Sequence, residues 1–214
     1  MQRESRLLGV GAEVAAFLLA ATCAGCDVPG TLLCARCRSG LVPRPQETVT
    51  PAGMPVQVAL EFDGVAARCI RRLKGEGETL LARPLGAALA IVLAPLVTAT
   101  TWVVPVPTGR AAFRRRGYRV PELLVRRAHA DPQRVLAAVG ARVDQRGLGA
   151  RAREVNAHGA MRARRRGEGA EVVIVDDVVT TGATLDEASR ALSAAGFRVV
   201  GAVALAATPR RSGF

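Results

Sequence analysis

The feature that most constrains the fold is a short apolar run that ends in two acids. Residues 172–175 are Val-Val-Ile-Val, and Asp176 and Asp177 follow them directly. Four consecutive apolar residues between polar neighbours predict a strand buried on both faces, as in a parallel sheet covered by helices. Open sheets of this kind bind ligands at the carboxyl ends of their strands. The two acids are therefore expected at the binding edge of an α/β domain.

The loop after the acids is expected to bind a phosphate. Residues 180–184 are Thr-Thr-Gly-Ala-Thr, and a helix is expected over 184–195. The N–H groups and dipole at a helix N-terminus favour an anion, and Gly182 lets a ligand approach the backbone closely. Adjacent carboxylates suit a vicinal diol with a divalent cation nearby. A phosphate, a diol and a divalent cation together are features of a bound ribose phosphate, so the segment predicts a ribose phosphate site. The alternative is a strand that ends in solvated acids before a helix cap.

Strands and helices are expected to alternate along the chain. This alternation predicts an α/β fold with a central, mostly parallel sheet flanked by helices. The Pro-rich residues 41–55 are expected to form a linker. Residues 140–169, rich in Gly and Arg, are expected to form a long polar excursion of the kind that often serves as a lid. Strands are expected at 56–60, 101–106, 135–139, 171–177 and 197–206, and further helices at 1–22, 64–74, 79–97 and 119–130.

Basic residues are concentrated in two stretches. The net charge is +12, and residues 110–127 and 142–168 together carry +11 of it. Such patches favour a polyanionic partner: phosphate, pyrophosphate or nucleic acid. The alternative is a solvated basic surface. Aromatic residues make up only 3% of the chain, which argues against a surface that stacks bases on several aromatic side chains.

Four of the five cysteines lie in two Cys-x-x-Cys pairs, formed by Cys23 with Cys26 and by Cys34 with Cys37. Two such turns direct four thiolates at one cation, which is the ligand set of a structural zinc site. The alternative is a pair of disulfides or unused thiols, but disulfides do not persist in a reducing cytoplasm. Cys69 is expected to be a small buried apolar residue of a helix.

The N-terminus carries Arg3 and Arg6, followed by an apolar run over 10–21. This pattern is shared by signal peptides and amphipathic helices. Glu13 interrupts the run, which is too short to span a membrane. We therefore expect an amphipathic helix, no membrane span and a cytoplasmic protein, with a signal peptide as the alternative.

Residues 172–184 resemble the signature of type I phosphoribosyltransferases, which bind phosphoribosyl pyrophosphate (PRPP). Further motifs make the chain similar to the competence-protein ComF family over about residues 17–207. The resemblance implies a type I phosphoribosyltransferase fold over 46–214, preceded over 1–45 by a helix and a zinc-binding segment with four cysteine ligands. These further motifs, in family order, are the paired Cys-x-x-Cys turns, Phe62-Asp63-Gly64, residues 71–75 (Arg-Arg-Leu-Lys-Gly), 104–107, 116–118 and 153–156.

The resemblance also implies a role for each matching residue. Mg²⁺ would accompany PRPP, zinc would be structural, and residues 140–169 would form a flexible hood over the site. Ribose hydroxyls would be held by Asp176 and Asp177, and the 5′-phosphate by Thr180, Thr181, Gly182, Ala183 and Thr184. Pyrophosphate would be bound by Pro107, Thr108, Gly109 and Arg110, and the hood would contribute Arg153 and Asn156 to catalysis.

The implied reaction is displacement of pyrophosphate from the anomeric carbon of PRPP by an unknown acceptor. The sequence departs from the family pattern in three places. Arg119 and Val120 stand where Asn-Gln is usual, and Met161 stands where an aromatic residue is usual. Thr180 stands where purine-salvage relatives have an aspartate base, which disfavours a 6-oxopurine acceptor.

Two alternatives to an enzyme remain open. In the first, the fold binds PRPP, nucleotide or single-stranded DNA without catalysis and assists DNA uptake, with a competence helicase as partner. In the second, it senses PRPP or nucleotide as a regulator. Fold likeness cannot decide between these roles and catalysis, because one fold supports many functions.

Overall fold

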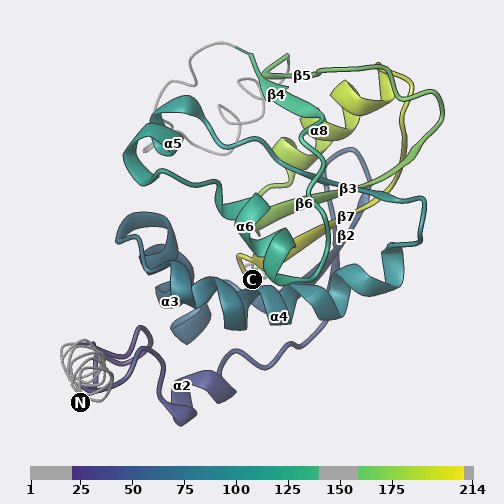
Figure 1. Cartoon of the computed structure of the whole chain (residues 1–214). Coiled ribbons are helices and arrows are strands. Elements are labelled where there is room, and N and C mark those ends of the chain that lie inside the picture. The colour runs from purple at the N-terminus through teal and green to yellow at the C-terminus, as the bar shows by residue number, and fades with distance from the viewer. Residues whose placement is uncertain (1–20, 140–158, 210–214) are drawn as a thin grey trace, which may run out of the picture.

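The computed structural model describes residues 21–139 and 159–209. Its centre is a five-stranded sheet with the order β1-β2-β7-β6-β3 (Figure 1). Strands β2, β7, β6 and β3 are parallel, and β1 pairs antiparallel with β2 at one edge. The mostly parallel α/β fold expected from the sequence is therefore confirmed. The strands are β1 (Gln46–Val49), β2 (Pro55–Glu61), β3 (Trp102–Pro105), β6 (Glu171–Val179) and β7 (Arg198–Ala207).

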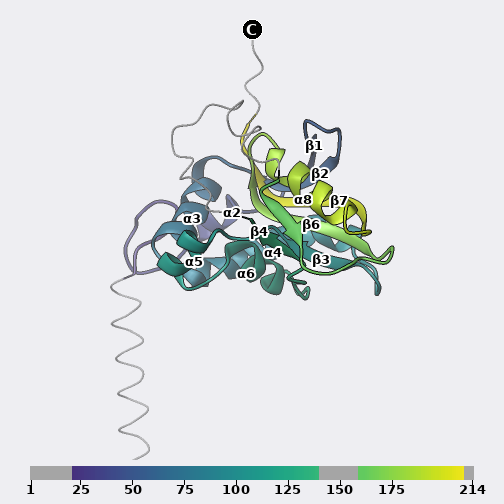
Figure 2. The same cartoon turned by 90° about the horizontal axis from the view of Figure 1, so that it is seen from above.

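Helices cover both faces of the sheet (Figure 2). One face carries the helices α3 (Gly64–Gly75), α4 (Ala82–Leu93) and α6 (Val120–Arg127). The other face carries α8 (Ala183–Ser193) together with a two-stranded sheet of β4 (Leu136–Ala138) and β5 (Met161–Ala163). Side chains of β6 serve both layers, because successive residues of a strand point to opposite faces. Val173 and Val175 pack in the α3–α4 layer, and Val172 and Ile174 in the α8 layer.

The helix expected over 79–97 is the most apolar of the described chain. It consists of α4 with a 3₁₀ turn on each side, η1 (Thr79–Leu81) and η2 (Ala94–Leu96). Among the described residues, Thr79–Leu96 is the one helical stretch long and apolar enough to cross a bilayer. However, Leu85, Leu89 and Leu93 are fully buried within the protein, and α4 packs against β2, β7 and α6. Its apolar face is thus part of the core.

The expected linker over 41–55 is only partly correct, because residues 46–49 form β1. The four prolines flank this strand at positions 43, 45, 51 and 55, so the central residues keep the N–H groups that a ladder needs. The excursion expected over 140–169 likewise contains β5, which pairs with β4. Residues 1–20 of the expected N-terminal helix and residues 140–158 of the excursion lie outside the described residues.

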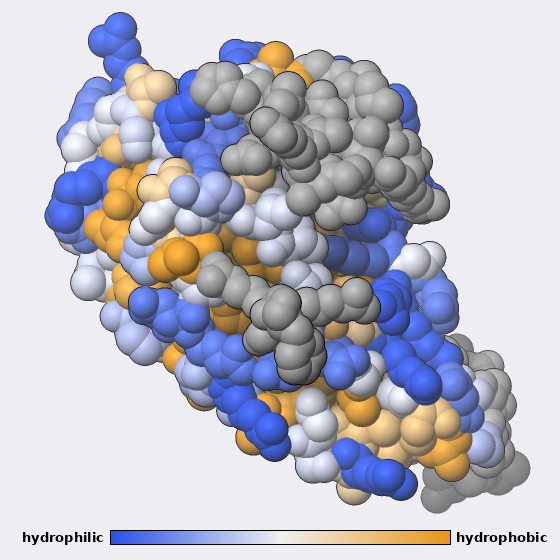
Figure 3. Space-filling model, turned by 180° about the vertical axis from the view of Figure 1, so that it is seen from behind, coloured by the Kyte–Doolittle hydropathy of each residue, from blue (hydrophilic) through white to orange (hydrophobic). Residues whose placement is uncertain are grey.

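The surface mixes hydrophilic and hydrophobic residues on the face opposite to that of Figure 1, as Figure 3 shows. Within the described chain, the exposed large apolar side chains are scattered along the sequence, and single ones are normal on a protein surface. They are Val28, Val42, Val49, Leu80, Ile91 and Val139.

Candidate functional site

The four cysteines of the paired Cys-x-x-Cys turns come together as the sequence predicts. Their Sγ atoms all lie within 4.8 Å of one another, and Cys26 Sγ is 3.7 Å from Cys34 Sγ. Ligands about 2.3 Å from a tetrahedral zinc ion are themselves about 3.8 Å apart. All five cysteines of the chain are free thiols, so the disulfide alternative is not what this structure contains. The set fits a zinc ion coordinated by Cys23, Cys26, Cys34 and Cys37.

The backbone around the cluster fixes the thiols in place. The N–H of Cys34 donates to Cys23 Sγ over 3.3 Å, and Cys34 itself caps the short helix α2 (Ala35–Ser39). A Cβ atom on Gly25 would lie 2.6 Å from Cys37 Sγ, so only glycine fits inside the first turn. Burial raises the pKa of Cys23, but hydrogen bonds from backbone N–H groups, first that of Cys34, outweigh it and give a pKa of about 6.

The charge state of the four thiols depends on their closeness to one another. Burial, together with the other cysteines, raises the pKa of Cys37. Four thiols in one cluster cannot all ionise unless a cation compensates the charge, and a bound metal ion deprotonates its thiol ligands. The chemistry of the donor set therefore suits a divalent cation.

The cysteine segment packs directly on α3. Cys23, Cys37 and Leu41 share a buried cluster with Ile70 and Leu73 of that helix. Polar contacts reinforce this packing. Arg68 donates to the carbonyl of Gly25 over 3.0 Å, and Arg72 pairs with Asp27 at 2.6 Å. The cysteine turns and the sheet domain are thus joined through one helix.

The acids of the signature lie within β6, as in the expected strand over 171–177, and the strand continues to Val179. Asp176 is in register with Ala204, and Val178 and Val179 continue the pairing with β7. The β-branched pair after the acids extends the strand. By the alternation of the strand, Asp177 faces the α3 layer with Val175, and Asp176 faces the α8 layer with Ile174. A ligand that contacts both acids must therefore lie across the end of the sheet.

Asp177 is paired with a residue that the sequence analysis did not assign to the site. Lys74, in the last turn of α3, places its Nζ 2.8 Å from Asp177 Oδ1. Tyr118 donates a short hydrogen bond from its hydroxyl to the carbonyl of Leu73, the residue before that lysine. The motifs at 71–75 and 116–118 thus meet the signature in space.

The predicted phosphate loop has the expected local geometry. Gly182 has φ +87° and is the N-cap of α8, whose first residue is Ala183. The positive φ and the close approach of Thr50, whose Cα would lie 3.0 Å from an added Cβ, both require glycine at position 182. Ala52, in the turn between β1 and β2, donates its N–H to Asp186 of α8 over 3.1 Å. The β1–β2 turn therefore braces the phosphate loop.

The predicted pyrophosphate residues lie beside the acids in the sheet. The chain leaves β3 at Val106, whose N–H donates to Val175 of β6 over 2.8 Å. Pro107 and Thr108 are half-buried, and Arg110 is exposed. Gly109 is the N-cap of α5 (Arg110–Arg116), a helix that the sequence analysis missed. This helix has no buried residue and ends in three arginines, so it presents cations next to the edge of the sheet.

The departure at Arg119 and Val120 is explained by packing. The guanidinium carbon of Arg119 lies 4.1 Å from the centre of the Phe113 ring, and its Nε lies 3.5 Å from Glu122 Oε1. Val120 is buried in the core at the start of α6. In this chain, therefore, residues 119 and 120 pack between α5 and α6, where the family pattern has the side-chain amides of Asn and Gln.

An ion pair with a buried carboxylate holds β5, which lies within the residues of the expected hood. Glu187 of α8 accepts from the N–H of Met161 over 2.9 Å and from Arg190 Nε over 2.7 Å. Burial raises the pKa of this carboxyl, but hydrogen bonds from Arg190 and Met161 outweigh burial and lower it. Met161 itself is buried in β5. The expected catalytic residues Arg153 and Asn156 lie outside the described residues.

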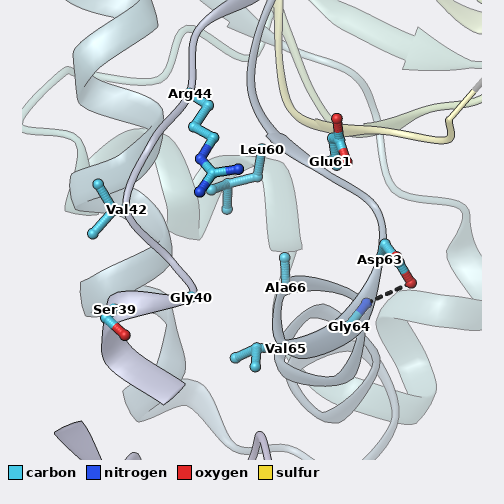
Figure 4. Close-up of a pocket in the computed structure, with 10 residues that line it drawn as sticks. All are labelled: Ser39, Gly40, Val42, Arg44, Leu60, Glu61, Asp63, Gly64, Val65 and Ala66. Carbon is cyan, nitrogen blue, oxygen red and sulfur yellow. Dashed lines mark hydrogen bonds between the residues drawn. The ribbon is translucent and has the colours of Figure 1, made fainter. Parts of the chain in front are cut away.

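A separate pocket of about 260 Å³ lies where the cysteine segment meets the sheet domain. Figure 4 shows that its lining comes from the chain after α2, the end of β2 and the first turn of α3. Asp63 lines it but caps α3 by accepting from the N–H of Gly64 over 2.6 Å. The residues expected to bind PRPP do not line this pocket.

Comparison with protein families identifies the segment that carries the signature. Residues 118–213 match the family described as "Phosphoribosyl transferase domain". This match runs from Tyr118 through the acids and the phosphate loop. The match covers less than half of the chain, so this segment is similar to phosphoribosyl transferase domains. A search of curated proteins finds no match.

Several solved structures are similar to this chain at low identity. UMP synthase of Leishmania donovani is 17% identical with a TM-score of 0.38, and the match covers 79% of this chain but only 30% of that one. Hypoxanthine phosphoribosyltransferase of Staphylococcus aureus is 17% identical with a TM-score of 0.33, covering 64% and 66% of the two chains. Orotate phosphoribosyltransferase of Aeropyrum pernix is 17% identical with a TM-score of 0.33, covering 80% and 90%.

Proposed function

We propose that the protein is a ComF-type phosphoribosyltransferase that binds PRPP with Mg²⁺ at the carboxyl edge of its sheet. The observation that carries this proposal is the adjacency of three parts at that edge. Asp176 and Asp177 lie near the end of β6, the loop over 180–184 leads into α8, and the loop over 107–110 follows the neighbouring β3. Ligands of open α/β sheets bind in this place.

Each part of PRPP has a chemically suitable counterpart. The N-terminus of α8 suits the 5′-phosphate, because the helix dipole there favours an anion. Carboxylates accept hydrogen bonds from ribose hydroxyls, and Mg²⁺, which prefers oxygen ligands and substrate phosphates, would neutralise the pyrophosphate. Gly109 and Arg110, at the start of α5, suit the pyrophosphate itself.

Displacement at the anomeric carbon builds positive charge on the sugar and negative charge on the leaving pyrophosphate. The main catalytic task is therefore to stabilise the leaving group. The arginines at the end of α5, Arg114, Arg115 and Arg116, add positive charge on the side of the pyrophosphate loop. Arg153 and Asn156 of the expected hood would complete this environment, and closing it would exclude water from the reacting carbon.

The acceptor is the least constrained part of the proposal. Thr180, the exposed residue at the start of the phosphate loop, has no carboxylate to act as a base toward a purine. A 6-oxopurine is therefore disfavoured as acceptor. Without a basic side chain at this position, an acceptor that is already nucleophilic is favoured.

Residues 1–45 would form a zinc-stabilised segment attached to a phosphoribosyltransferase domain over 46–214. The zinc would be structural, because four thiolates fill its coordination sphere. A cytoplasmic location follows from the need to keep four clustered thiols reduced.

Calorimetry with PRPP and Mg²⁺ tests the proposal. We expect saturable binding that requires Mg²⁺ and that is competed by ribose 5-phosphate. A pyrophosphate-release assay over a panel of nucleobases and amines would then identify the acceptor. A folded, zinc-loaded protein that shows no heat with saturating PRPP and Mg²⁺ would refute the proposal.

A second candidate function is supported by the exposure of α5. Its arginines lie on a helix without any buried residue, which suits the phosphate backbone of single-stranded DNA during uptake, with a competence helicase as partner. Arginine–phosphate binding releases counterions and reads no bases, so it should weaken steeply with salt. Binding that persists at high salt with a sequence preference would favour the non-catalytic DNA role over the enzyme.

A further inference from the structure

Lys74 is the only lysine of the chain, and it lies at the proposed ligand edge. Its Nζ is 2.8 Å from Asp177 Oδ1, and its side chain is 31% exposed against 12% for the aspartate. The proposed function assigns Asp177 to a ribose hydroxyl but gives Lys74 no role. An ammonium group held on a ligand-binding carboxylate is therefore unexplained by the fold.

The backbone around Lys74 is fixed, whereas its side chain reaches the solvent. On its N-terminal side, Leu73 is fully buried and its carbonyl accepts the hydroxyl of Tyr118. Arg72 is bound to Asp27 and to Glu78, at 2.6 and 3.0 Å. The last turn of α3 is thus held from two sides, and the flexible four-carbon stem of the lysine is free to redirect its charge.

A diol and an ammonium group compete for the same carboxylate oxygens. When a ribose hydroxyl donates a hydrogen bond to Asp177, the ion pair between Lys74 and that carboxylate weakens. The ammonium group of Lys74 then needs another anion. Tyr118, which anchors the turn of Lys74, lies two residues beyond the arginines that end α5. The last turn of α3, which carries Lys74, therefore lies near the end of α5, the helix that follows the proposed pyrophosphate loop.

We propose that Lys74 binds the pyrophosphate of PRPP and is stored on Asp177 until the ligand arrives. This inference rests on the proposed function and adds a residue to it. The exchange conserves charge, because the diol takes the place of the ammonium on the carboxylate while the ammonium neutralises one of the pyrophosphate charges.

The experiment compares two ligands that differ in the pyrophosphate alone. Binding of PRPP with Mg²⁺ and of ribose 5-phosphate is measured by calorimetry for the wild type and for Lys74→Met. The variant should bind PRPP about 10- to 100-fold more weakly, since a charge-assisted contact is lost. Its affinity for ribose 5-phosphate should stay level or rise, because Asp177 no longer has to release a partner.

Arg71→Met is the matched control. This arginine belongs to the same helix but stacks over the ring of Phe62 at 5.3 Å, so removing its charge should change neither affinity by more than about 2-fold. Lys74→Gln, which keeps a polar partner for Asp177, makes the same test if the methionine variant does not fold. Lys74→Arg should restore part of the PRPP affinity.

The outcomes separate this inference from the proposed function. If the variants keep wild-type affinity for PRPP, the inference is wrong and the proposed function stands. If PRPP and ribose 5-phosphate weaken equally, Lys74 only orients Asp177, and the inference is again wrong. If the wild type binds neither ligand, the proposed function fails and the inference fails with it.

Discussion

The cysteine cluster and the carboxyl edge of the sheet are assembled from very different parts of the chain. The four thiols come from the fifteen consecutive residues 23–37. The contacts at the carboxyl edge join residues far apart, with 103 positions between Lys74 and Asp177 and 134 between Ala52 and Asp186. The first site is specified by local turns, and the second by the packing of the whole domain.

This difference predicts how each region responds to damage. A local cluster held by a metal ion should fail when one ligand is removed, because each ligand is essential to the coordination sphere. An edge built from distant segments should lose binding without losing the fold when a surface acid changes, and should lose stability when a residue that joins its segments changes. Four substitutions test these expectations.

Removal of a zinc ligand should have the largest effect. Cys34→Ser is expected to reduce zinc from one ion per chain to near zero, because it removes one of the four ligands. Structural zinc contributes about 10 kcal/mol or more to the folding of such segments, so the cysteine segment should be destabilised as well. Metal content by mass spectrometry, after purification under reducing conditions, measures this directly. Residues 21–45 should also lose hydrogen-exchange protection.

Cys69→Ser is the control for that substitution. Cys69 is fully buried in α3 but lies outside the four-cysteine group, and burial raises its pKa to about 11. The control variant should therefore keep its zinc even if its stability falls. Full-length wild type that carries no zinc would contradict the assignment of the cluster.

Replacing both acids should have the next largest effect. Asp176→Asn with Asp177→Asn is expected to weaken PRPP binding by roughly 10- to 1,000-fold, since charge-assisted hydrogen bonds to the ribose are lost. The stability of the ligand-free protein should change little, because the lost ion pair with the partly exposed Lys74 is offset by reduced repulsion between the acids.

A double substitution elsewhere provides the matched charge change. Glu47→Gln with Asp131→Asn removes two exposed carboxylates that, among the described residues, accept hydrogen bonds from Gln57 and Gln133, and it should leave PRPP affinity unchanged. Wild-type affinity in the Asp176/Asp177 variant would show that the signature is not a ribose phosphate site.

Gly182→Ala should destabilise the edge without touching its charges. The positive φ and the 3.0 Å approach to the Cα of Thr50 predict a loss of about 2–4 kcal/mol in the free energy of unfolding. Gly77→Ala is the control, because its φ is +77° but nothing lies within 4 Å of the added Cβ. Chemical denaturation should show a larger loss at position 182, and equal losses would mean that the turn over 50–53 does not brace the phosphate loop.

The smallest effect is expected from Glu187→Gln, and it should depend on pH. Because the folded protein lowers the pKa of Glu187 from the ordinary 4.5, its ionised form stabilises the fold above pH 4.5. That stabilisation is lost as the pH falls through the lower folded pKa. At pH 7 the variant should lose about 1–2 kcal/mol, and the gap to the wild type should narrow in acid.

Glu171→Gln serves as the comparison for this pH dependence. Its carboxylate pairs with the exposed Arg198 at the start of β7, so its removal should matter little at any pH. Thermal unfolding between pH 3 and pH 7 would distinguish the two variants. A gap for Glu187→Gln that is independent of pH would indicate packing rather than charge.

The sequence was sufficient for the local site and for the individual parts of the distant one. The Cys-x-x-Cys spacing predicts the cluster, and the apolar run over 172–175 predicts an interior strand of the sheet, because both are short-range patterns. The strand β6 runs two residues beyond the expected 171–177, because Val178 and Val179 continue the pairing with β7. The helix α5 was missed because four arginines with two alanines and one phenylalanine show no apolar periodicity.

The meeting of distant parts could not be predicted. Nothing in residues 71–75 indicates that Lys74 reaches Asp177, because that contact depends on where α3 packs after β2. The same holds for the close approach of Thr50 to Gly182 and for the hydrogen bond from the Met161 N–H to Glu187. For Lys74 alone a signal was available, since a single lysine among so many arginines is an anomaly of composition.

The helix α3 contacts both regions. Its arginines Arg68 and Arg72 hold the cysteine turns, and Lys74, at its end, holds Asp177. Because a shift of this helix would move the contacts at both ends, we expect zinc occupancy and PRPP affinity to be coupled. If zinc changes the affinity for PRPP by some factor, PRPP must change the affinity for zinc by the same factor. Retention of zinc against a chelator would then serve as a readout of occupancy at the distant edge.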